Sequence, residues 1–405
     1  MKWNWQQSEW PEFSWKQARL LKAEALFLVE AGEYAGTAKH LGAEDREQLT
    51  VEAMSTEAVT TSEIEGEILD RTSVQSSIRR QLGLATDHRK VGAAEQGVSE
   101  MMVDLHRTCA EPLSHDMLFR WHRMLTTGRR DLKDVGSYRT HVEPMQVVSG
   151  AIHEPKVHFE APPSASVPAE MSRFIDWFNR SAPGNAEPLP ALTRAGIAHL
   201  YFICIHPFED GNGRIGRAIA EKALAQCLGH PTLMALAATI LAKRNAYYAL
   251  LEANNKHQEI TPWLIWFAAT AIEAQRRSIA MVDFLIDKTR LLDRLRDQLN
   301  ERQKKALLRM LREGPKGFEG ALSAGKYASI TGASPATATR DLADLVAKQA
   351  LVRSGEQRHT RYEIAIPLRP VLPVAIDEHG KLKYHRLIAE RLNRVQAGYK
   401  SRGKP

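Results

Sequence analysis

The chain is 405 residues long, has a net charge of +7 and contains only three cysteines, which are not clustered. This length predicts two or three domains with sizeable hydrophobic cores. No apolar run is long enough for a membrane span, and the polar and aromatic residues after Met1 do not resemble a signal peptide. We therefore expect a cytoplasmic protein with reduced cysteines and no membrane partner.

The first half of the chain contains three features that can be recognised before any motif is named. Four tryptophans surround Pro11, which indicates aromatic surface packed against another part of the chain. Further along, Thr60 to Glu67 reads TTSEIEGE, which taken alone is typical of an ordinary exposed acidic helix. Two short runs, Met145 to Val148 and Lys156 to Phe159, are separated by turn residues and predict a β-hairpin.

The segment 206–217 reads HPFEDGNGRIGR and lies between two predicted helices. Apolar residues recur at helical spacing from Ala191 to Ile205 and again from Arg214 to Leu228, and Pro207 prevents the first helix from continuing. The segment is therefore predicted to be a loop that leads into a helix N-terminus. There, unpaired backbone N–H groups and a partial positive charge favour the binding of phosphate.

The residues at the start of the second helix suit a phosphate ligand. Gly211 and Gly213 let the backbone come close to the ligand, and Asn212 between them offers an amide donor. Arg214 and Arg217 are three positions apart, so both project from one helix face towards phosphate oxygens.

The loop also contains a candidate metal ligand and a candidate base. Asp210 is placed to hold Mg²⁺ against phosphate oxygens, because magnesium needs only one or two carboxylates beside phosphate and water. His206 is the one group of the loop that ordinarily titrates near neutrality, which suits a general base that takes a hydroxyl proton. Phe208 is interpreted as an apolar plug that holds the loop down.

The complete segment resembles the signature of the Fic family, and every fixed position of that signature is filled. The resemblance implies an α-helical domain that transfers AMP from ATP to a Ser, Thr or Tyr hydroxyl of a protein and releases pyrophosphate. In that scheme His206 is the base, Asp210 the Mg²⁺ ligand, Gly211 to Gly213 the anion hole, and the two arginines hold the outer phosphates. The Doc-like branch, which phosphorylates, usually has lysine where Gly213 stands, so Gly213 favours nucleotidyl transfer.

The acidic stretch upstream resembles the inhibitory motif of the same family, with Thr61, Glu65 and Gly66 at its fixed positions. The resemblance implies that Glu65 pairs with Arg217 where the γ-phosphate should lie, so that ATP does not reach its reactive pose. It also implies that the hairpin is the family's flap, whose edge aligns the target segment by strand addition. Tyr248 corresponds to an aromatic residue that is a candidate to pack on adenine, although simple coverage of the core is nearly as good an interpretation.

The last third of the chain has a different charge from the rest. Residues 301–405 contain 21 Lys and Arg against 10 Asp and Glu, which leaves the first 300 residues with 34 against 38. Helical patterns at 303–311, at 323–330 and from Ser334 to about 350 precede two strand-like runs, at 351–354 and 361–366. This order resembles a winged helix-turn-helix.

A basic winged helix indicates DNA, and the candidate phosphate contacts are Arg340, Arg353, Arg358 and Arg361. Asp341 and Asp344 on the same helix argue against DNA, and winged helices also serve as dimerisation or target-docking modules. Both interpretations stay open.

We predict a mostly α protein with a Fic-type helical core, a β-hairpin flap and a C-terminal winged helix domain. Its parts are an N-terminal helical domain with the inhibitory motif (1–95), the catalytic core (96–285), the winged helix-turn-helix (286–370) and a basic tail (371–405). We expect the tail to be a solvated helix with a frayed end.

The predicted function is a protein adenylyltransferase that uses ATP with Mg²⁺, modifies a target protein and itself, and is autoinhibited by Glu65. The alternatives are a DNA-binding regulator whose Fic core acts as a sensor or self-modifier, and a Fic-fold phosphotransferase. Family members often dimerise through their helical cores, so a homodimer is a further candidate.

Overall fold

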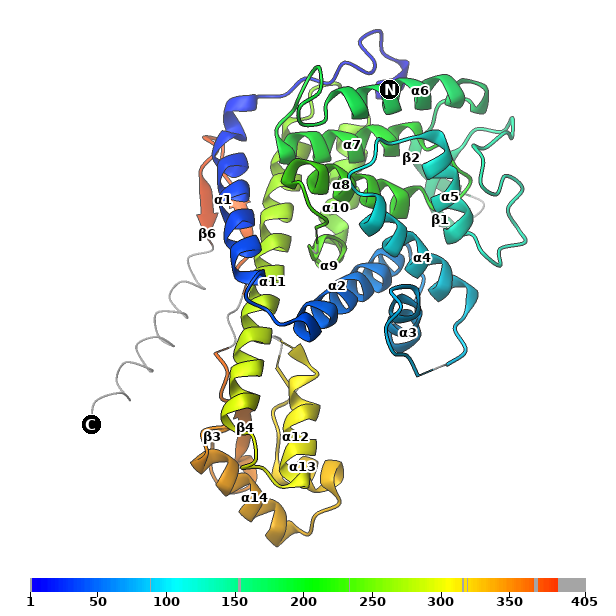
Figure 1. Cartoon of the computed structure of the whole chain (residues 1–405). Coiled ribbons are helices and arrows are strands. Elements are labelled where there is room, and N and C mark those ends of the chain that lie inside the picture. Colours follow the sequence, from blue (N-terminus) through cyan, green and yellow to red (C-terminus); the bar gives the residue numbers. More distant parts are fainter. Residues whose placement is uncertain are drawn as a thin grey trace. The chain divides into compact units, whose positions relative to one another are not determined.

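The computed structural model describes residues 2–87, 89–151, 154–232, 234–314, 317–318, 320–367 and 371–384. The chain divides into two compact units. The described residues of the first unit lie within 2–33, 50–276 and 372–384, and those of the second lie within 34–49, 277–367 and 371. Helices dominate both units in the described part of the chain, so the predicted mostly α class is confirmed (Figure 1).

The elements that precede residue 300 are mainly helices, and one hairpin lies among them. In chain order they are η1 (Asn4–Gln6), η2 (Gln17–Arg19), α1 (Leu21–Ala38), α2 (Ala43–Ile64), α3 (Arg71–Gln81), α4 (Ala93–Thr108), α5 (His115–Leu125), β1 (Gln146–Ala151), β2 (Glu154–Glu160), η3 (Ser164–Ser166), α6 (Val167–Arg180), α7 (Ala191–Ile205), α8 (Asn212–Leu228), α9 (Leu236–Leu241), α10 (Arg244–Asn254) and α11 (Thr261–Arg294).

Helices α7 and α8 lie side by side and form the centre of the first unit (Figure 1). Helix α7 is apolar on nearly every side, and all its residues except Ile203 are buried, as expected for a helix without a polar face. Its N-terminus is capped by the Glu24 carboxylate of α1, which accepts the backbone N–H groups of Leu192 and Thr193 at 3.0 and 2.8 Å. The cap thus fixes where α7 begins, and the helix ends at Ile205, directly before His206.

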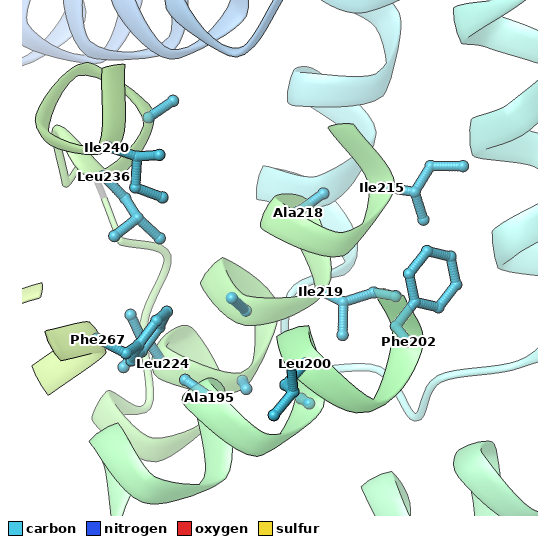
Figure 2. Close-up of a cluster of buried hydrophobic side chains, with 14 of the residues drawn as sticks. Ala195, Leu200, Phe202, Ile215, Ala218, Ile219, Leu224, Leu236, Ile240 and Phe267 are labelled. Atoms are coloured by element: carbon cyan, nitrogen blue, oxygen red, sulfur yellow. The ribbon is translucent and has the colours of Figure 1, made fainter. Parts of the chain in front are cut away.

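Buried apolar side chains join α7 and α8 to the helices around them. Figure 2 shows Phe202 of α7 with Ile215 and Ile219 of α8 in one such cluster, and all three are fully buried. Each side chain of this size contributes roughly 1.5–3 kcal/mol when it leaves water. This packing makes the α7–α8 connection a rigid platform for the loop between them.

The N-terminal tryptophans pack against this core, as the sequence analysis expects. Trp10 meets Tyr201 of α7 edge to face with ring centroids 5.1 Å apart, and its indole N–H donates to Glu170 of α6 at 2.9 Å. Trp5 donates to the carbonyl of Glu160 at 2.7 Å, at the end of β2. The tryptophan segment therefore holds both the core and the base of the hairpin.

Strands β1 and β2 form the predicted hairpin. They pair antiparallel from Gln146 opposite Glu160 to Ala151 opposite Glu154, with a register shift between Val147 and Val148. The hairpin is longer than the two runs predicted from the sequence.

The prediction of a helical tail is wrong for residues 371–384. Strands β5 (Val374–Ile376) and β6 (Leu382–Tyr384) pair antiparallel. The turn between them is made by Asp377, whose carboxylate accepts two backbone N–H groups, and by Gly380 in a left-handed conformation at φ 70°. Val374 is buried, so the strand is tied to the first unit rather than solvated. The rest of the predicted tail, 385–405, lies outside the described residues.

The second unit contains the helices and strands that the sequence predicts, in the predicted order. They are α12 (Glu301–Leu311), α13 (Ala324–Thr331), α14 (Pro335–Ala347), β3 (Leu351–Ser354) and β4 (Arg361–Ile364). A short helix, η5 (Gln357–His359), lies in the connection between β3 and β4. Side chains of Asn300, Ser323 and Ser334 cap the three helices. Helix α14 ends slightly before the predicted position, and the winged helix assignment itself stays a prediction.

Within the described part of the chain, every helix is too short or too polar to span a membrane.

Candidate active site

His206 lies directly after the last residue of α7, in a left-handed conformation with φ 51° and ψ 58°. Its Nδ1 atom is 3.3 Å from the carbonyl oxygen of Ile203, a contact that places the ring proton on Nδ1 and leaves Nε2 as an acceptor. Burial lowers the pKa of His206 to about 4, so the ring is neutral at neutral pH. A neutral imidazole with a free Nε2 can take a proton from a hydroxyl group.

The loop after His206 turns into the N-terminus of α8 as predicted, with Gly211 at φ 82°. The structure gives the Asn212 side chain a different partner from the predicted ligand. Its Nδ2 atom donates to the carbonyl of Phe208 at 2.7 Å, and its Oδ1 atom accepts the N–H of Phe208 at 3.0 Å. This amide therefore closes the loop, and the backbone N–H groups in the first turn of α8 are what the segment offers to an anion. Phe208 is fully buried and stacks on His122, consistent with its interpretation as a plug.

Two of the three residues of the predicted inhibitory motif, Thr61 and Glu65, contact Arg217. Its Nη2 atom is 2.7 Å from Oε1 of Glu65 and also donates to the carbonyl of Thr61, while its Nε atom donates to the Thr61 hydroxyl at 2.7 Å. Gly66, at φ 87°, turns the chain directly after Glu65. A Cβ atom at Gly213 would lie 2.0 Å from Oε1 of Glu65, so a side chain there would displace this carboxylate.

Two further ion pairs involve Arg214 and Asp210. Arg214 is 2.7 Å from the Glu67 carboxylate, and Asp210 is 2.6 Å from Arg129, which also pairs with Asp131. The sequence analysis missed both partners. Glu67 stands in the quoted TTSEIEGE stretch, so its charge was a signal, whereas nothing near Arg129 in the sequence points to the site.

Asp210 has the charge that a metal ligand needs. Burial opposes ionisation, but Arg214 and the hydrogen bond from Arg129 outweigh it and keep the pKa of Asp210 below its ordinary value. Among the described residues, no group of three or more His, Cys, Asp or Glu side chains could hold a metal by itself. One ionised carboxylate beside a phosphate site fits Mg²⁺, which takes its other ligands from phosphate and water.

His206 and the loop open into a pocket of about 750 Å³ between the β1–β2 hairpin and α10. Tyr248 lines this pocket and donates from its hydroxyl to the carbonyl of Ile64 at 3.1 Å. Its neighbour Tyr247 also lines the pocket but is buried and bonded to His199. Asn255 also lines the pocket, and its buried Oδ1 atom has no hydrogen-bond partner among the described residues. No sequence pattern had distinguished this acceptor.

The hairpin is tied to α10 by a hydrogen-bonded chain. His158 of β2 lies 2.8 Å from the Glu252 carboxylate through Nδ1 and 2.6 Å from the Ser149 hydroxyl through Nε2. These hydrogen bonds hold the hairpin against α10, beside the pocket.

Residues 112–224, which include the whole 206–217 segment, match the model of the Fic/DOC family. The protein therefore contains a Fic/DOC family domain. Residues 3–84 match a second model, described as a domain of unknown function (DUF4172).

Curated relatives resemble the same part of the chain. The "Protein adenylyltransferase Fic" of Drosophila willistoni is 30% identical over 131 residues, which are 32% of this chain and 24% of that protein. The "Protein adenylyltransferase fic-1" of Caenorhabditis elegans is 28% identical over 145 residues, 36% of this chain and 25% of that protein. The matched segment thus spans about a quarter of these relatives.

Among solved structures, a Fic family protein from Desulfovibrio desulfuricans G20 has a similar fold. The TM-score is 0.50 at 20% sequence identity, and the match covers 87% of this chain and 98% of that one. The similarity extends beyond the family domain to most of the chain.

Proposed function

We propose that this protein is an adenylyltransferase that transfers AMP from ATP to a hydroxyl side chain of a target protein and of itself, and that Glu65 restrains it. The observation that carries the proposal is the convergence of a neutral histidine and a helix N-terminus on one pocket. Arg214 and Arg217 follow in the same helix, and Arg217 pairs with Glu65, which lines that pocket. The names of the relatives, which describe protein adenylyltransferases, support the same reaction.

The chemistry follows from where these groups lie. The phosphates of ATP would bind the N-terminus of α8 and both arginines, and its adenine ring would lie in the pocket beside Tyr248. Nε2 of His206 accepts the proton of the target hydroxyl as its oxygen bonds to the α-phosphorus. The bond from that phosphorus to the bridging oxygen breaks, and pyrophosphate leaves. Mg²⁺ at Asp210 would neutralise phosphate charge during this step.

In the conformation described, the two arginines are already neutralised by carboxylates of the chain. Arg217 is nearly fully buried, so its bond with Glu65 is charge-assisted and shielded from water. A γ-phosphate would compete with Glu65 for the same guanidinium. ATP would then bind in a pose that does not present its α-phosphorus to His206, which is our account of the restraint.

The test is transfer of label from ATP carrying ³²P in the α-phosphate. Glu65→Gly is expected to raise self-labelling at least tenfold over the parent chain, because Arg217 becomes free for phosphate. Adding His206→Ala to Glu65→Gly should abolish that labelling while the protein stays folded.

The same assay separates the competing functions. Label that transfers only from γ-labelled ATP would establish phosphorylation instead. Unchanged labelling of Glu65→Gly would contradict the inhibitory role of Glu65, and equal labelling with and without His206 would contradict its role as the base.

A further inference from the structure

One buried arginine beneath the site has no role in the scheme above. Arg139 is 2% exposed. Its Nε atom donates to the carbonyl of His206 at 2.9 Å, and Nη2 donates to the carbonyl of Pro162 at 2.6 Å and, more weakly, to that of Ile205 at 3.5 Å. Its Nη1 atom donates to the hydroxyl of Ser164 at 2.8 Å.

The backbone of Arg139 is attached to the same loop as its side chain. Its N–H donates to the carbonyl of Pro207 at 3.0 Å. Main chain and side chain of one residue therefore hold the carbonyl groups of His206 and Pro207, where α7 stops and the loop begins.

We propose that Arg139 is a positioning residue for the predicted base. It holds the backbone of His206 in the left-handed conformation that aims the imidazole into the pocket, and it fixes that backbone to the two ends of the flap. The inference rests on the proposed function, since it concerns how the base of that reaction is placed.

The first half of this role follows from the backbone of His206. A left-handed conformation is unfavourable for a residue with a side chain, and it persists only where the surroundings enforce it. The last carbonyl groups of α7 also lack helical partners. A buried guanidinium that donates to these carbonyls satisfies them and opposes the negative end of the helix dipole, so it stabilises this conformation.

The second half follows from the other contacts of the guanidinium. Pro162 and Ser164 lie just after β2, and the Ser164 hydroxyl donates to the carbonyl of His141, which precedes β1. The chain entering the flap and the chain leaving it therefore meet at Arg139. A segment aligned on the flap edge would be held in register with His206 through this one side chain.

The charge of Arg139 adds a measurable consequence. Burial lowers the pKa of Arg139 to about 10, so it stays protonated at neutral pH. Besides burial, the charges that face His206 are Arg139, which disfavours protonation of the ring, and Glu65 and Asp210, which favour it. Removing the positive charge therefore raises the pKa of His206.

The test compares Arg139→Gln and Arg139→Lys in the Glu65→Gly background. For Arg139→Gln we expect kcat for AMP transfer to fall at least tenfold while the Kd for ATP changes less than twofold. The acid limb of the rate profile, and the titration of His206 followed by NMR of ¹³C-labelled histidine, should move up by about one pH unit. Arg139→Lys keeps the charge, so it should leave the titration in place and restore part of kcat.

Arg194 offers a matched control. It is also fully buried and also donates to backbone carbonyls, those of Phe178 and Ala223, at the other end of α7. Arg194→Gln should leave the His206 titration unchanged, as a purely structural arginine would.

The proposal is overturned if folded Arg139→Gln retains both the parent kcat and the parent titration of His206, or if Arg194→Gln moves that titration equally. If Arg139→Gln does not fold, Ser164→Ala decides: loss of the flap contact should lower the rate of self-labelling at least threefold without moving the titration, and an unchanged rate overturns the role. Absence of AMP transfer by Glu65→Gly would sink the proposed function, yet the histidine titration would still test Arg139.

Discussion

At the scale of single residues, three charged groups of the 206–217 segment are paired with opposite charges of the protein. Glu65 pairs with Arg217, Glu67 with Arg214, and Arg129 with Asp210. The two glutamates lie on either side of Gly66, so one short segment covers both arginines. We therefore propose that the restraint on the site is shared between two carboxylates, of which the predicted inhibitory motif contains only one.

Glu67→Gln should tighten ATP binding. Arg214 is buried but Glu67 is more than a third exposed, so solvent partly screens this ion pair. We therefore expect the Kd for ATP to fall by only about threefold. The increase in self-labelling should be smaller than for Glu65→Gly, because Arg217 stays paired. Isothermal titration of ATP measures the first effect.

Glu63→Gln is the matched control for this measurement. Glu63 precedes the same turn, and among the described residues it pairs with neither arginine. Equal ATP affinity of Glu67→Gln and the parent would show that the Glu67 pair does not oppose the ligand.

At the scale of elements, α2 is joined to α8 by more than the Thr61 and Glu65 contacts. One turn before Thr61, Glu57 lines a cavity of about 20 Å³ together with Glu221 of α8 and with His106 and Cys109. Glu57 is buried, and its Oε1 atom has no hydrogen-bond partner among the described residues. Burial and the neighbouring Glu221 raise the pKa of Glu57 well above its ordinary value, although Arg217 opposes this, and burial raises that of Glu221 to about 7.

These shifts predict a stability that falls as the pH rises. The raised pKa values mean that the folded protein binds protons that the unfolded chain has lost, so stability decreases from the ordinary carboxyl range near 4.5 up to about 7. We expect the Tm to be on the order of 2–4 °C higher at pH 5 than at pH 7.5 from this pair.

Glu57→Gln should reduce that difference, because the amide does not ionise, whereas Glu63→Gln on the same helix should leave it unchanged. Thermal unfolding followed by circular dichroism at the two pH values measures it. A pH dependence of Glu57→Gln equal to that of the parent would contradict the assignment.

At the scale of the whole molecule, the second unit bears on the alternative of DNA binding. Asp341 on α14, which argued against DNA, is buried and pairs with Arg302 while accepting the hydroxyl of Tyr327. Arg340 and Arg353 are exposed. The acid therefore points into the unit, and the exposed charge of these elements is more positive than the sequence alone indicates. The side chain of Arg358 lies outside the description.

The full chain is expected to shift a DNA duplex in a gel at low salt, with binding that weakens steeply as salt increases. Arg340→Ala combined with Arg353→Ala should weaken this binding at least tenfold. Arg309→Ala should not weaken it, because Arg309 of α12 is already paired with Glu313. Absence of a shift even at low salt would remove DNA as a partner of this unit and favour a protein-docking role.

The sequence by itself predicted the helix–loop–helix that contains the site. The spacing of apolar residues placed the first helix at 191–205, where α7 is found. It started the second helix at 214, whereas α8 begins at Asn212. The hairpin was predicted equally well, because alternation and turn residues are local signals. The prediction of a helical tail was wrong for 371–384 because the turn at Asp377 and Gly380 was not recognised as a turn between strands.

Only the tertiary structure decided which partners the site residues have. Arg139, Arg129 and Glu67 reach the loop from positions 67 to 147 residues away in the chain, and Glu57 meets Glu221 in the same way. A period of 2 or 3.6 residues reports which face an element buries and carries no information on which distant charge that face will meet. The sequence therefore determined the groups that we propose act on phosphate, and the packing of α2, α7 and α8 decided which distant residues these groups contact.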